Sequence, residues 1–496
     1  MNRTSFSRHL PSNLSMLEEE FQSCSDVEFR ELTLLSGVKG VLIFIDGLVK
    51  SEYLQDNVLR PLLHRLDEVN GTFVAPKQLE EQVVTITKLS RTSCFTESVD
   101  AILSGNALLL VEDSAEAIVL KVAGGTRRSV QQPDSEVNIR GPREGFIESL
   151  RTNTSLLRFK IKSSKLKLVP FIIGERTKTN VALAYIEDLA DPKLIDEITK
   201  RLQAIKIDSV LESGYIEEFI EDHPYSPFPQ FRYTERPDVV AAQLLEGRFA
   251  IFVDGTPFVL TAPITFWSML QANEDYYERY MIGNLIRWLR YMFMTVALLL
   301  PSLYIAISTY HQDMLPSTLL HSISAAREAI PFPALVEALI MEVAFEALRE
   351  AGIRLPKTIG QAVSILGALV IGQSAVQAGI VSAPMVIIVS LTGIASFTIP
   401  HFNMSISIRI LRFPLMFLAG ILGLFGIVVG VFIISLHLCR LHSFGIPYMS
   451  GFAPYRKNKM KDMFVRAPWW KMKKRSQTAR DKKRTQSNSS SPEPAK

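Results

Sequence analysis

The pattern of polar and apolar positions divides the chain into two halves. The first 265 residues mix charged and apolar residues throughout, whereas residues 291–312, 358–408 and 413–439 contain no Lys, Arg, Asp or Glu. A helix needs about 20 apolar residues to cross about 30 Å of hydrocarbon. The pattern therefore predicts a polytopic α-helical membrane domain behind a polar N-terminal half. Four crossings are expected, at about residues 291–310, 359–380, 384–400 and 413–437.

The N-terminal half alternates segments that have strand and helix patterns. Residues 37–49 have the pattern of a buried strand ending in an Asp-Gly turn, and residues 51–68 repeat apolar positions at helical spacing. Later, Asp191 and Pro192 are suited to start a helix. Two hairpins are predicted, at residues 107–122 and 249–263. We therefore expect a soluble α/β domain in two lobes.

The segments expected along the chain follow from where these patterns change. Charged and low-complexity stretches bound the lobes and the helical domain at both ends. In order, they are a partly helical, partly disordered lead (1–36), a first α/β lobe (37–137), a linking helix region (138–161), a second α/β lobe (162–265), a juxtamembrane segment (266–290), a transmembrane domain (291–440), a short post-membrane segment (441–454) and a basic disordered cytoplasmic tail (455–496).

One segment of the membrane half is unusual because it is acidic. Residues 331–356 are apolar enough for a bilayer, yet they carry Glu337, Glu342, Glu346 and Glu350. Acidic groups at membrane depth are costly and usually sit at pathways, cavities or paired sites. The segment is therefore the first candidate for a functional site.

Charge around the predicted spans bears on whether this segment crosses the membrane. Arg287 and Arg290 precede the first span, and Arg440 with the basic tail follows the last. Basic residues favour the cytoplasmic side, so both ends are expected there and the number of crossings is even. Four spans satisfy this condition. The acidic segment is then expected to be a short re-entrant or interfacial helix on the outer side, or to pack within protein around an aqueous path.

Two interpretations of the acidic helix stay open. On an ideal helix, Glu342 and Glu346 share a face with Arg349, and Glu337 points elsewhere. In the first interpretation, Glu342 and Glu346 project into an aqueous path and attract cations, as acidic rings do in cation channels. In the second, an amphipathic helix lies on the outer surface with its charges solvated or paired to Arg349 and Arg354.

The predicted span at 359–380 is rich in small residues, which let helices approach closely. Gln373 and Gln377 lie four residues apart on one face of it. They either line a pore or join helices through hydrogen bonds. The candidate ion path therefore comprises Glu337, Glu342, Glu346, Gln373 and Gln377.

Aromatic and basic residues gather ahead of the first predicted span. Side chains of these types favour the interface between lipid and water. The expected membrane anchors are Trp267, Arg287, Trp288 and Arg290.

Net charge is +4, but the basic charge is concentrated at one end. Residues 455–496 contain 14 Lys and Arg against 3 Asp and Glu. A basic tail directly after a span favours a role in topology and contact with anionic lipid over binding to nucleic acid. The three cysteines are isolated, which does not suggest a disulfide framework.

No motif in the sequence favours catalysis. Walker, GxGxxG, GxSxG and HExxH patterns are absent, and the eight His are scattered. Two SxxK matches, at Ser36/Lys39 and Ser164/Lys167, are short enough to arise by chance. We therefore expect neither an enzyme nor a cofactor or metal site.

Several longer motifs carry a resemblance to a known family. In chain order they are NIRGPREGF, YIEDLADPKLIDEITKRL, FPQFRYTERPD, VDGTPF, REAGIRLP, IGQSAVQAGIVS and SFGIPY. With these motifs, residues 35 to 454 resemble the A-subunit family of GerA-type spore germinant receptors. The REAGIRLP motif falls on the C-terminal part of the acidic segment, at residues 349–356.

The resemblance implies a location, partners and a role. Such proteins sit in the spore inner membrane with a transporter-like B subunit and a lipoprotein C subunit, and the complex triggers germination in response to small nutrients. Nutrient recognition is generally assigned to the B subunit, and the A subunit is proposed to form a homo-oligomeric ligand-gated ion channel. A secondary solute transporter and a non-conducting membrane scaffold are the alternative functions.

Overall fold

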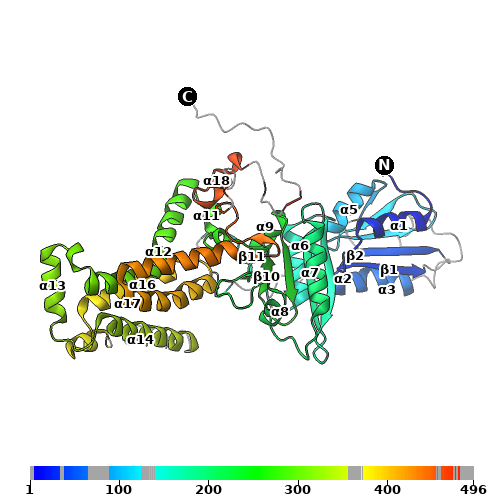
Figure 1. Ribbon diagram of the computed structural model, residues 1–496. Helices are drawn as coiled ribbons and strands as arrows, with labels where there is room; N and C mark the ends of the chain where they lie inside the picture. The colour runs from blue at the N-terminus through cyan, green and yellow to red at the C-terminus, as the bar shows by residue number, and fades with distance from the viewer. Residues whose placement is uncertain are drawn as a thin grey trace. The chain divides into compact units, whose positions relative to one another are not determined.

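The computed structural model describes residues 5–33, 38–64, 89–124, 140–355, 372–453 and 460–472, with positions 133, 136, 138, 370, 455, 475, 479 and 480. The chain divides into two compact units (Figure 1). The α/β unit comprises Met1–Glu221, Phe231–Pro263 and Trp469–Lys496, and the helical unit comprises Asp222–Gln230 and Ile264–Pro468.

The first lobe of the α/β unit is an antiparallel five-stranded sheet in the order β1-β2-β4-β5-β3. Its central strands are apolar on both faces because helices cover each side. Val41 and Ile43 of β2 pack with α1 and α5, whereas Leu42 between them packs with α2 and α3. The elements are α1 (Leu10–Glu20), β1 (Val27–Thr33), β2 (Lys39–Ile45), α2 (Ser51–Leu54), η1 (Gln55–Leu59), α3 (Arg60–His64), β3 (Leu89–Thr92), α5 (Phe95–Leu103), β4 (Ala107–Val111) and β5 (Ala117–Leu120).

The second lobe repeats this topology with a different sequence. Its strand order is β6-β7-β9-β10-β8, which is the order of the first lobe with five added to each strand number. Neighbouring strands are again antiparallel. In both lobes, helices follow the second strand and another helix follows the third. The elements are α6 (Leu150–Lys160), β6 (Leu166–Ile173), β7 (Thr179–Ile186), α7 (Pro192–Ala204), α8 (Ser213–Ile220), β8 (Arg232–Thr234), α9 (Pro237–Leu245), β9 (Phe249–Val253) and β10 (Val259–Ala262).

The sequence predicted most of the local elements of the α/β unit. Both predicted hairpins form, as β4–β5 and β9–β10, and the Asp191 carboxylate accepts a hydrogen bond from the Lys193 backbone N–H at 3.0 Å. In the lead, α1 is the helical part that the sequence predicts, and β1 adds an edge strand to the first sheet. Strand β1 is an edge strand that alternates apolar and polar residues, so its signal is weaker than that of the buried β2.

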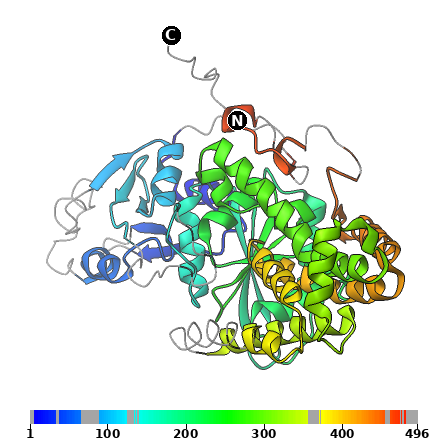
Figure 2. The ribbon, with the colours of Figure 1, turned by 90° about the vertical axis from the view of Figure 1, so that its left-hand side faces the viewer.

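The helical unit contains the apolar helices. Within this unit α12, α16 and α17 pack against one another, and α14 contacts all three (Figure 2). Its elements are α10 (Phe266–Met269), α11 (Glu274–Tyr277), α12 (Tyr280–Tyr310), η3 (Gln312–Met314), α13 (Ser317–Arg327), α14 (Ala334–Arg354), α16 (Ala383–Phe397), α17 (Phe402–Arg440), β11 (His442–Ser443), β12 (Ile446–Pro447) and α18 (Met460–Met463).

Two helices among the described residues, α12 and α17, are long and apolar enough to cross a membrane. They contain the predicted spans at 291–310 and 413–437. Helix α16 covers the prediction at 384–400 but has 15 residues, about 22 Å at 1.5 Å per residue, which is shorter than the hydrocarbon core. Most of the predicted span at 359–380 lies outside the described residues. Two of the four predicted spans therefore coincide with candidate spans among the described residues, and the four-span prediction is not confirmed.

Helix α17 is broken near its middle. Gly423 has φ of +62°, a conformation that suits glycine and interrupts the helical hydrogen bonds. The Tyr310 hydroxyl donates to the carbonyl oxygens of Gly420 and Ile421, at 2.9 and 3.1 Å. Irregular backbone among apolar helices is tolerated where protein groups satisfy the freed carbonyls. The end of α12 thus caps the break in α17.

Candidate functional site on helix α14

Helix α14 carries the acidic residues that the sequence singled out. It begins after Pro333, places Glu337 in its first turn, and ends at Arg354 with a basic residue in its last turn. Acidic residues near the N-terminus and basic residues near the C-terminus both stabilise the helix dipole. Its 21 residues form one continuous helix, longer than the short helix expected from the charge pattern.

Glu342 is completely buried and paired with Arg412 of α17. The Arg412 Nη1 donates to the Glu342 Oε2 at 2.5 Å, and both side chains are at most 1% exposed. A buried charge is stable only when an opposite charge and hydrogen bonds compensate its loss of water. This pair therefore links α14 to α17 inside the helical unit.

Glu346, one helical turn further, contacts two arginines. Its Oε2 accepts from Arg409 Nη1 of α17 at 3.1 Å and also from Arg349 on its own helix. Arg409 is buried, and Glu346 is half-buried. Two successive acidic residues of α14 thus face two arginines spaced three apart on α17, which forms a ladder of charge pairs.

Glu337 faces other partners, as the helical spacing predicts. It is fully buried, and its Oε1 accepts from both the backbone N–H and the hydroxyl of Ser382, the N-cap of α16. Its Oε2 lies 3.7 Å from Nε of Arg327, the last residue of α13. Glu337 therefore joins the start of α16 to the end of α13.

The expected contact of Glu342 with water is not found in this chain. The alternative of solvated or locally paired charges holds for Glu350, which pairs with Arg354 at the exposed end of α14. It holds in part for Glu346, through Arg349. Both interpretations overlooked the same fact, that the main partners come from another helix.

The sequence contained a signal for those partners. Arg409 and Arg412 are the only charged residues between two long uncharged runs, and they are spaced three apart. Basic residues within apolar helices are costly unless acidic residues pair with them. Arg409 and Arg412 lie about one helical turn apart, as do Glu342 and Glu346, so the two helices could have been predicted to pair through these charges.

Gln373 and Gln377 occupy a different position from the glutamates. Both lie on the helical stretch 372–377, and both side chains are exposed. In the part of the chain that the structure describes, neither glutamine has a hydrogen bond to α14. The structure thus brings together the three glutamates with the α17 arginines, and leaves the two glutamines outside that network.

The predicted anchors are mostly interior residues. Arg287 and Arg290 of α12 both bind Asp275, the first through Nε at 3.2 Å and the second through Nη1 and Nη2 at 3.0 and 3.2 Å. Trp267 is buried, whereas Trp288 is exposed and donates from Nε1 to the Phe464 carbonyl at 2.7 Å. Of the four predicted anchors, Trp288 therefore has the exposure typical of an interfacial side chain. The two arginines are buried because they bind Asp275.

The acidic residues of α14 are also of a type that can bind metal ions. Among the described residues, no group of three or more His, Cys, Asp or Glu is placed to hold a metal ion. The acidic residues of α14 are instead compensated by guanidinium groups and a helix N-cap.

These features define a class of protein, a membrane-associated chain with a two-lobed α/β unit and a helical unit that contains buried charge pairs. The chain matches over residues 15–478 the family described as Bacillus/Clostridium GerA spore germination protein. It belongs to this GerA family. Members of the family are germinant receptor subunits rather than enzymes.

Relatives match over almost the whole chain. The uncharacterized membrane protein YfkQ of Bacillus subtilis (strain 168) is 59% identical, with 95% of this chain and 91% of the relative covered. Spore germination protein KA of the same organism is 46% identical, with 98% and 90% covered. Spore germination protein GerLA of Bacillus cereus is 39% identical, with 95% of both chains covered.

A match is also found among solved structures. It is the N-terminal domain of the A subunit of the Bacillus megaterium spore germinant receptor GerK3. The identity is 36% and the TM-score 0.42, and the match covers 53% of this chain and 97% of that domain.

Proposed function

We propose that this chain is the A subunit of a nutrient germinant receptor in the spore inner membrane. It assembles with a transporter-like B subunit and a lipoprotein C subunit, triggers germination, and as a homo-oligomer forms a ligand-gated cation channel. Membership of the GerA family supports the receptor role. The basic residues that flank the predicted spans support a cytoplasmic side for the N-terminal domain and the C-terminal tail.

The observation that carries the channel proposal is the charge ladder between α14 and α17. Glu342 and Glu346 lie on a helix that packs against both candidate spans, and Arg412 and Arg409 neutralise them within one chain. Carboxylates in a helical unit of this kind are suited to attract cations once water reaches them. The proposed ion path comprises Glu337, Glu342, Glu346, Gln373 and Gln377.

The arrangement described corresponds in this proposal to a closed state. The guanidinium groups occupy the positions that permeant cations would take beside the carboxylates. Breaking a buried pair costs several kcal/mol, because each charge is left without compensation. Opening therefore requires α14 and α17 to separate while water or a cation replaces each arginine.

Spores that carry substitutions in the ladder test this proposal. Glu342→Gln and Glu346→Gln together remove the cation-attracting charges, and Glu350→Gln on the exposed end of the same helix is the matched control. We expect the double variant to change the rate of cation release after nutrient addition about tenfold or more, with normal amounts of assembled receptor on immunoblots. Normal release with both glutamates neutralised would contradict the proposed path.

A transporter is the second candidate, and the break in α17 favours it. Discontinuous helices form the substrate sites of many secondary transporters, and Gly423 interrupts α17 among apolar helices. The internal pairing of the glutamates favours the third candidate, a scaffold. Reconstitution of the purified chain in liposomes separates the three, because a channel conducts ions, a transporter accumulates solute, and a scaffold does neither.

A further inference from the structure

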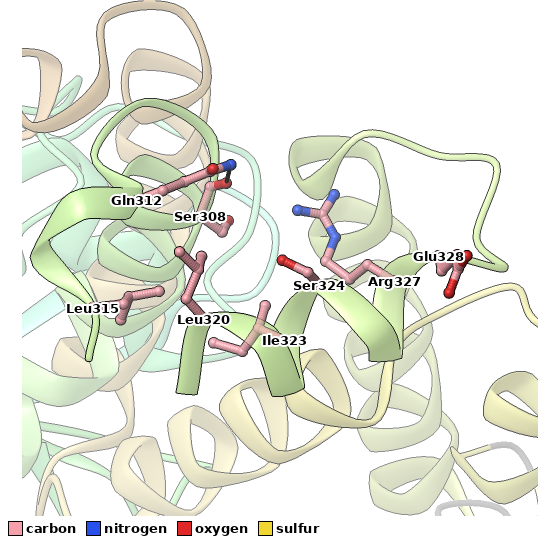
Figure 3. Close-up of a pocket in the computed structure, with 8 residues that line it drawn as sticks. All are labelled: Ser308, Gln312, Leu315, Leu320, Ile323, Ser324, Arg327 and Glu328. Atoms are coloured by element: carbon pink, nitrogen blue, oxygen red, sulfur yellow. Dashed lines mark hydrogen bonds between the residues drawn. The ribbon is translucent and has the colours of Figure 1, made fainter. Parts of the chain in front are cut away.

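A pocket lies at the junction of α12 and α13, apart from the charge ladder. Its volume is about 220 Å³. Ser308 and Gln312 line it from the end of α12 and η3, and Ser324 and Arg327 line it from α13. Figure 3 shows the Arg327 guanidinium and the Ser324 hydroxyl on the side that faces Ser308, whereas Glu328 turns away.

Arg327 is only partly satisfied by the surrounding protein. Its Nε approaches Oε2 of Glu337 at 3.7 Å, which is an ion pair but too long for a hydrogen bond. Both of these atoms are buried, and neither has a hydrogen-bond partner among the described residues. A guanidinium carries five N–H donors in a planar fork that matches a carboxylate. Arg327 thus keeps donors for a ligand on the side that faces the pocket.

The rest of the pocket is apolar. Leu315, Leu320 and Ile323 line it, and all three are half-buried. Figure 3 shows these side chains together below Ser308 and Gln312. The volume corresponds to roughly seven water molecules at about 30 Å³ each, below the range of pockets for drug-sized ligands. Its occupant is therefore a small molecule with one anionic end and a short apolar end.

We propose that this pocket binds a small monocarboxylate, with the carboxylate on Arg327 and Ser324 and the alkyl chain against Leu315, Leu320 and Ile323. A carboxylate fits better than a spherical anion because the guanidinium fork pairs two oxygens and the apolar wall contacts carbon. The residues that line the pocket are not part of the proposed ion path, but Arg327 pairs with Glu337 of that path, and binding alone tests the site.

Binding at this pocket is linked to buried Glu337. A ligand carboxylate competes with Glu337 for the same guanidinium, so the pair at 3.7 Å is weakened when the pocket fills. Glu337 then depends on Ser382, which donates two hydrogen bonds to its other oxygen at the N-cap of α16. Occupancy of the pocket is thereby transmitted to the contact between α14 and α16.

Saturation-transfer NMR on the full chain in detergent micelles, with butyrate as the probe, tests the site. We expect butyrate to bind with a Kd on the order of millimolar, as suits six heavy atoms. Butyramide, the neutral isostere, is expected to bind at least about tenfold more weakly because it lacks the charge that Arg327 recognises. Equal binding of butyramide, or equal competition by chloride, would overturn the proposal.

Variants of the Arg327–Glu337 pair test whether Arg327 binds the carboxylate. Arg327→Gln is expected to weaken butyrate binding about tenfold or more, and Glu337→Gln to strengthen it several-fold, because the competing carboxylate is gone. Arg327→Gln alone leaves Glu337 buried and unpaired, so the double variant Arg327→Gln/Glu337→Gln keeps the fold testable and should also fail to bind. Arg354→Gln, an exposed arginine on α14, is the control. Unchanged binding in the double variant refutes the site.

Discussion

Two clusters of buried charge in the helical unit differ in how completely they are satisfied. Asp275 uses both carboxylate oxygens, since Arg290 contacts each of them and Arg287 contacts one. On α14, by contrast, each glutamate of the candidate path has one oxygen without a hydrogen-bond partner among the described residues. These oxygens are Oε2 of Glu337, Oε1 of Glu342 and Oε1 of Glu346.

The difference separates a structural cluster from a candidate functional one. A fully bonded buried carboxylate gains nothing from rearrangement, so the Asp275 cluster is expected to fix α11 to α12 permanently. A carboxylate with an unused oxygen can gain a partner in another arrangement, such as a cation or water. Incomplete satisfaction, more than burial itself, therefore makes α14 the part of the unit that we propose to move on opening.

The largest effect is expected from loss of Asp275. Asp275→Ala removes the carboxylate that buried Arg290 and Arg287 share, and leaves Arg287 with Asp462 at 3.4 Å. The loss should cost about 5 kcal/mol, the upper end for a broken buried pair. Thermal unfolding of the purified protein in detergent measures it, and Asp313→Asn, an exposed acid in η3, is the control. A loss as small as that of the control would remove the distinction between the two clusters.

A smaller effect is expected from the Glu342–Arg412 pair. Arg412→Gln leaves Glu342 buried and alone, at a cost of about 3 kcal/mol, and adding Glu342→Gln should restore much of it. The same cycle on the exposed pair Glu350–Arg354 should give at most about 0.5 kcal/mol. Unfolding midpoints of the four variants in each cycle measure the coupling. If the losses of unfolding free energy in the two single variants simply add in the double variant, Glu342 and Arg412 do not stabilise each other.

The smallest effect concerns the acidic residues on and beside α8. Burial and repulsion from neighbouring Glu221, Glu212 and Glu218 raise the pKa of Glu217 on α8 to about 7, and burial with repulsion from Glu218 raises that of Glu221 to about 7. The carboxyl groups of Glu217 and Glu221 therefore bind protons more tightly in the folded chain than in the unfolded chain. The stability that this protonation contributes is complete below about pH 4.5 and is lost as pH rises through 7.

Substitution of Glu217 tests this dependence. Between pH 5.5 and 8 the unfolding midpoint of the full chain should fall, and Glu217→Gln should reduce that fall by about 2–4 °C. Glu175→Gln, in the loop between β6 and β7, leaves the cluster intact and serves as control. An identical pH profile in both variants would show that protonation does not relieve the repulsion on α8.

The same contrast explains what could be predicted from the sequence. Both hairpins and the Asp191 cap depend on neighbouring residues, so local patterns identified them. The partners of Glu342 and Glu346 lie on another helix, more than 60 positions away, and no periodicity within one helix reveals them. The exact match of topology between the two lobes was also hidden, because it is a property of strand pairing and not of residue identity.

Arg287 and Arg290 show the same dependence on the fold. Their position ahead of an apolar run is typical of membrane anchors, and the sequence does not show that Asp275 turns them inward. Composition distinguishes a basic residue from an apolar one, but only the fold decides whether its charge meets lipid headgroups or a carboxylate. The anchor role stays a prediction, and it is supported geometrically for Trp288 alone.

The order of the two units along the chain has a consequence for biosynthesis. The last strand of the second sheet, β10, ends at Ala262, before the first apolar helix begins at Tyr280. At about 5–20 residues per second, a ribosome completes the strands of both sheets about 2–10 seconds before the whole of α12 has been made. Each lobe therefore has all of its strands available before α12 is ready for insertion, and folding of the polar half does not have to wait for the bilayer.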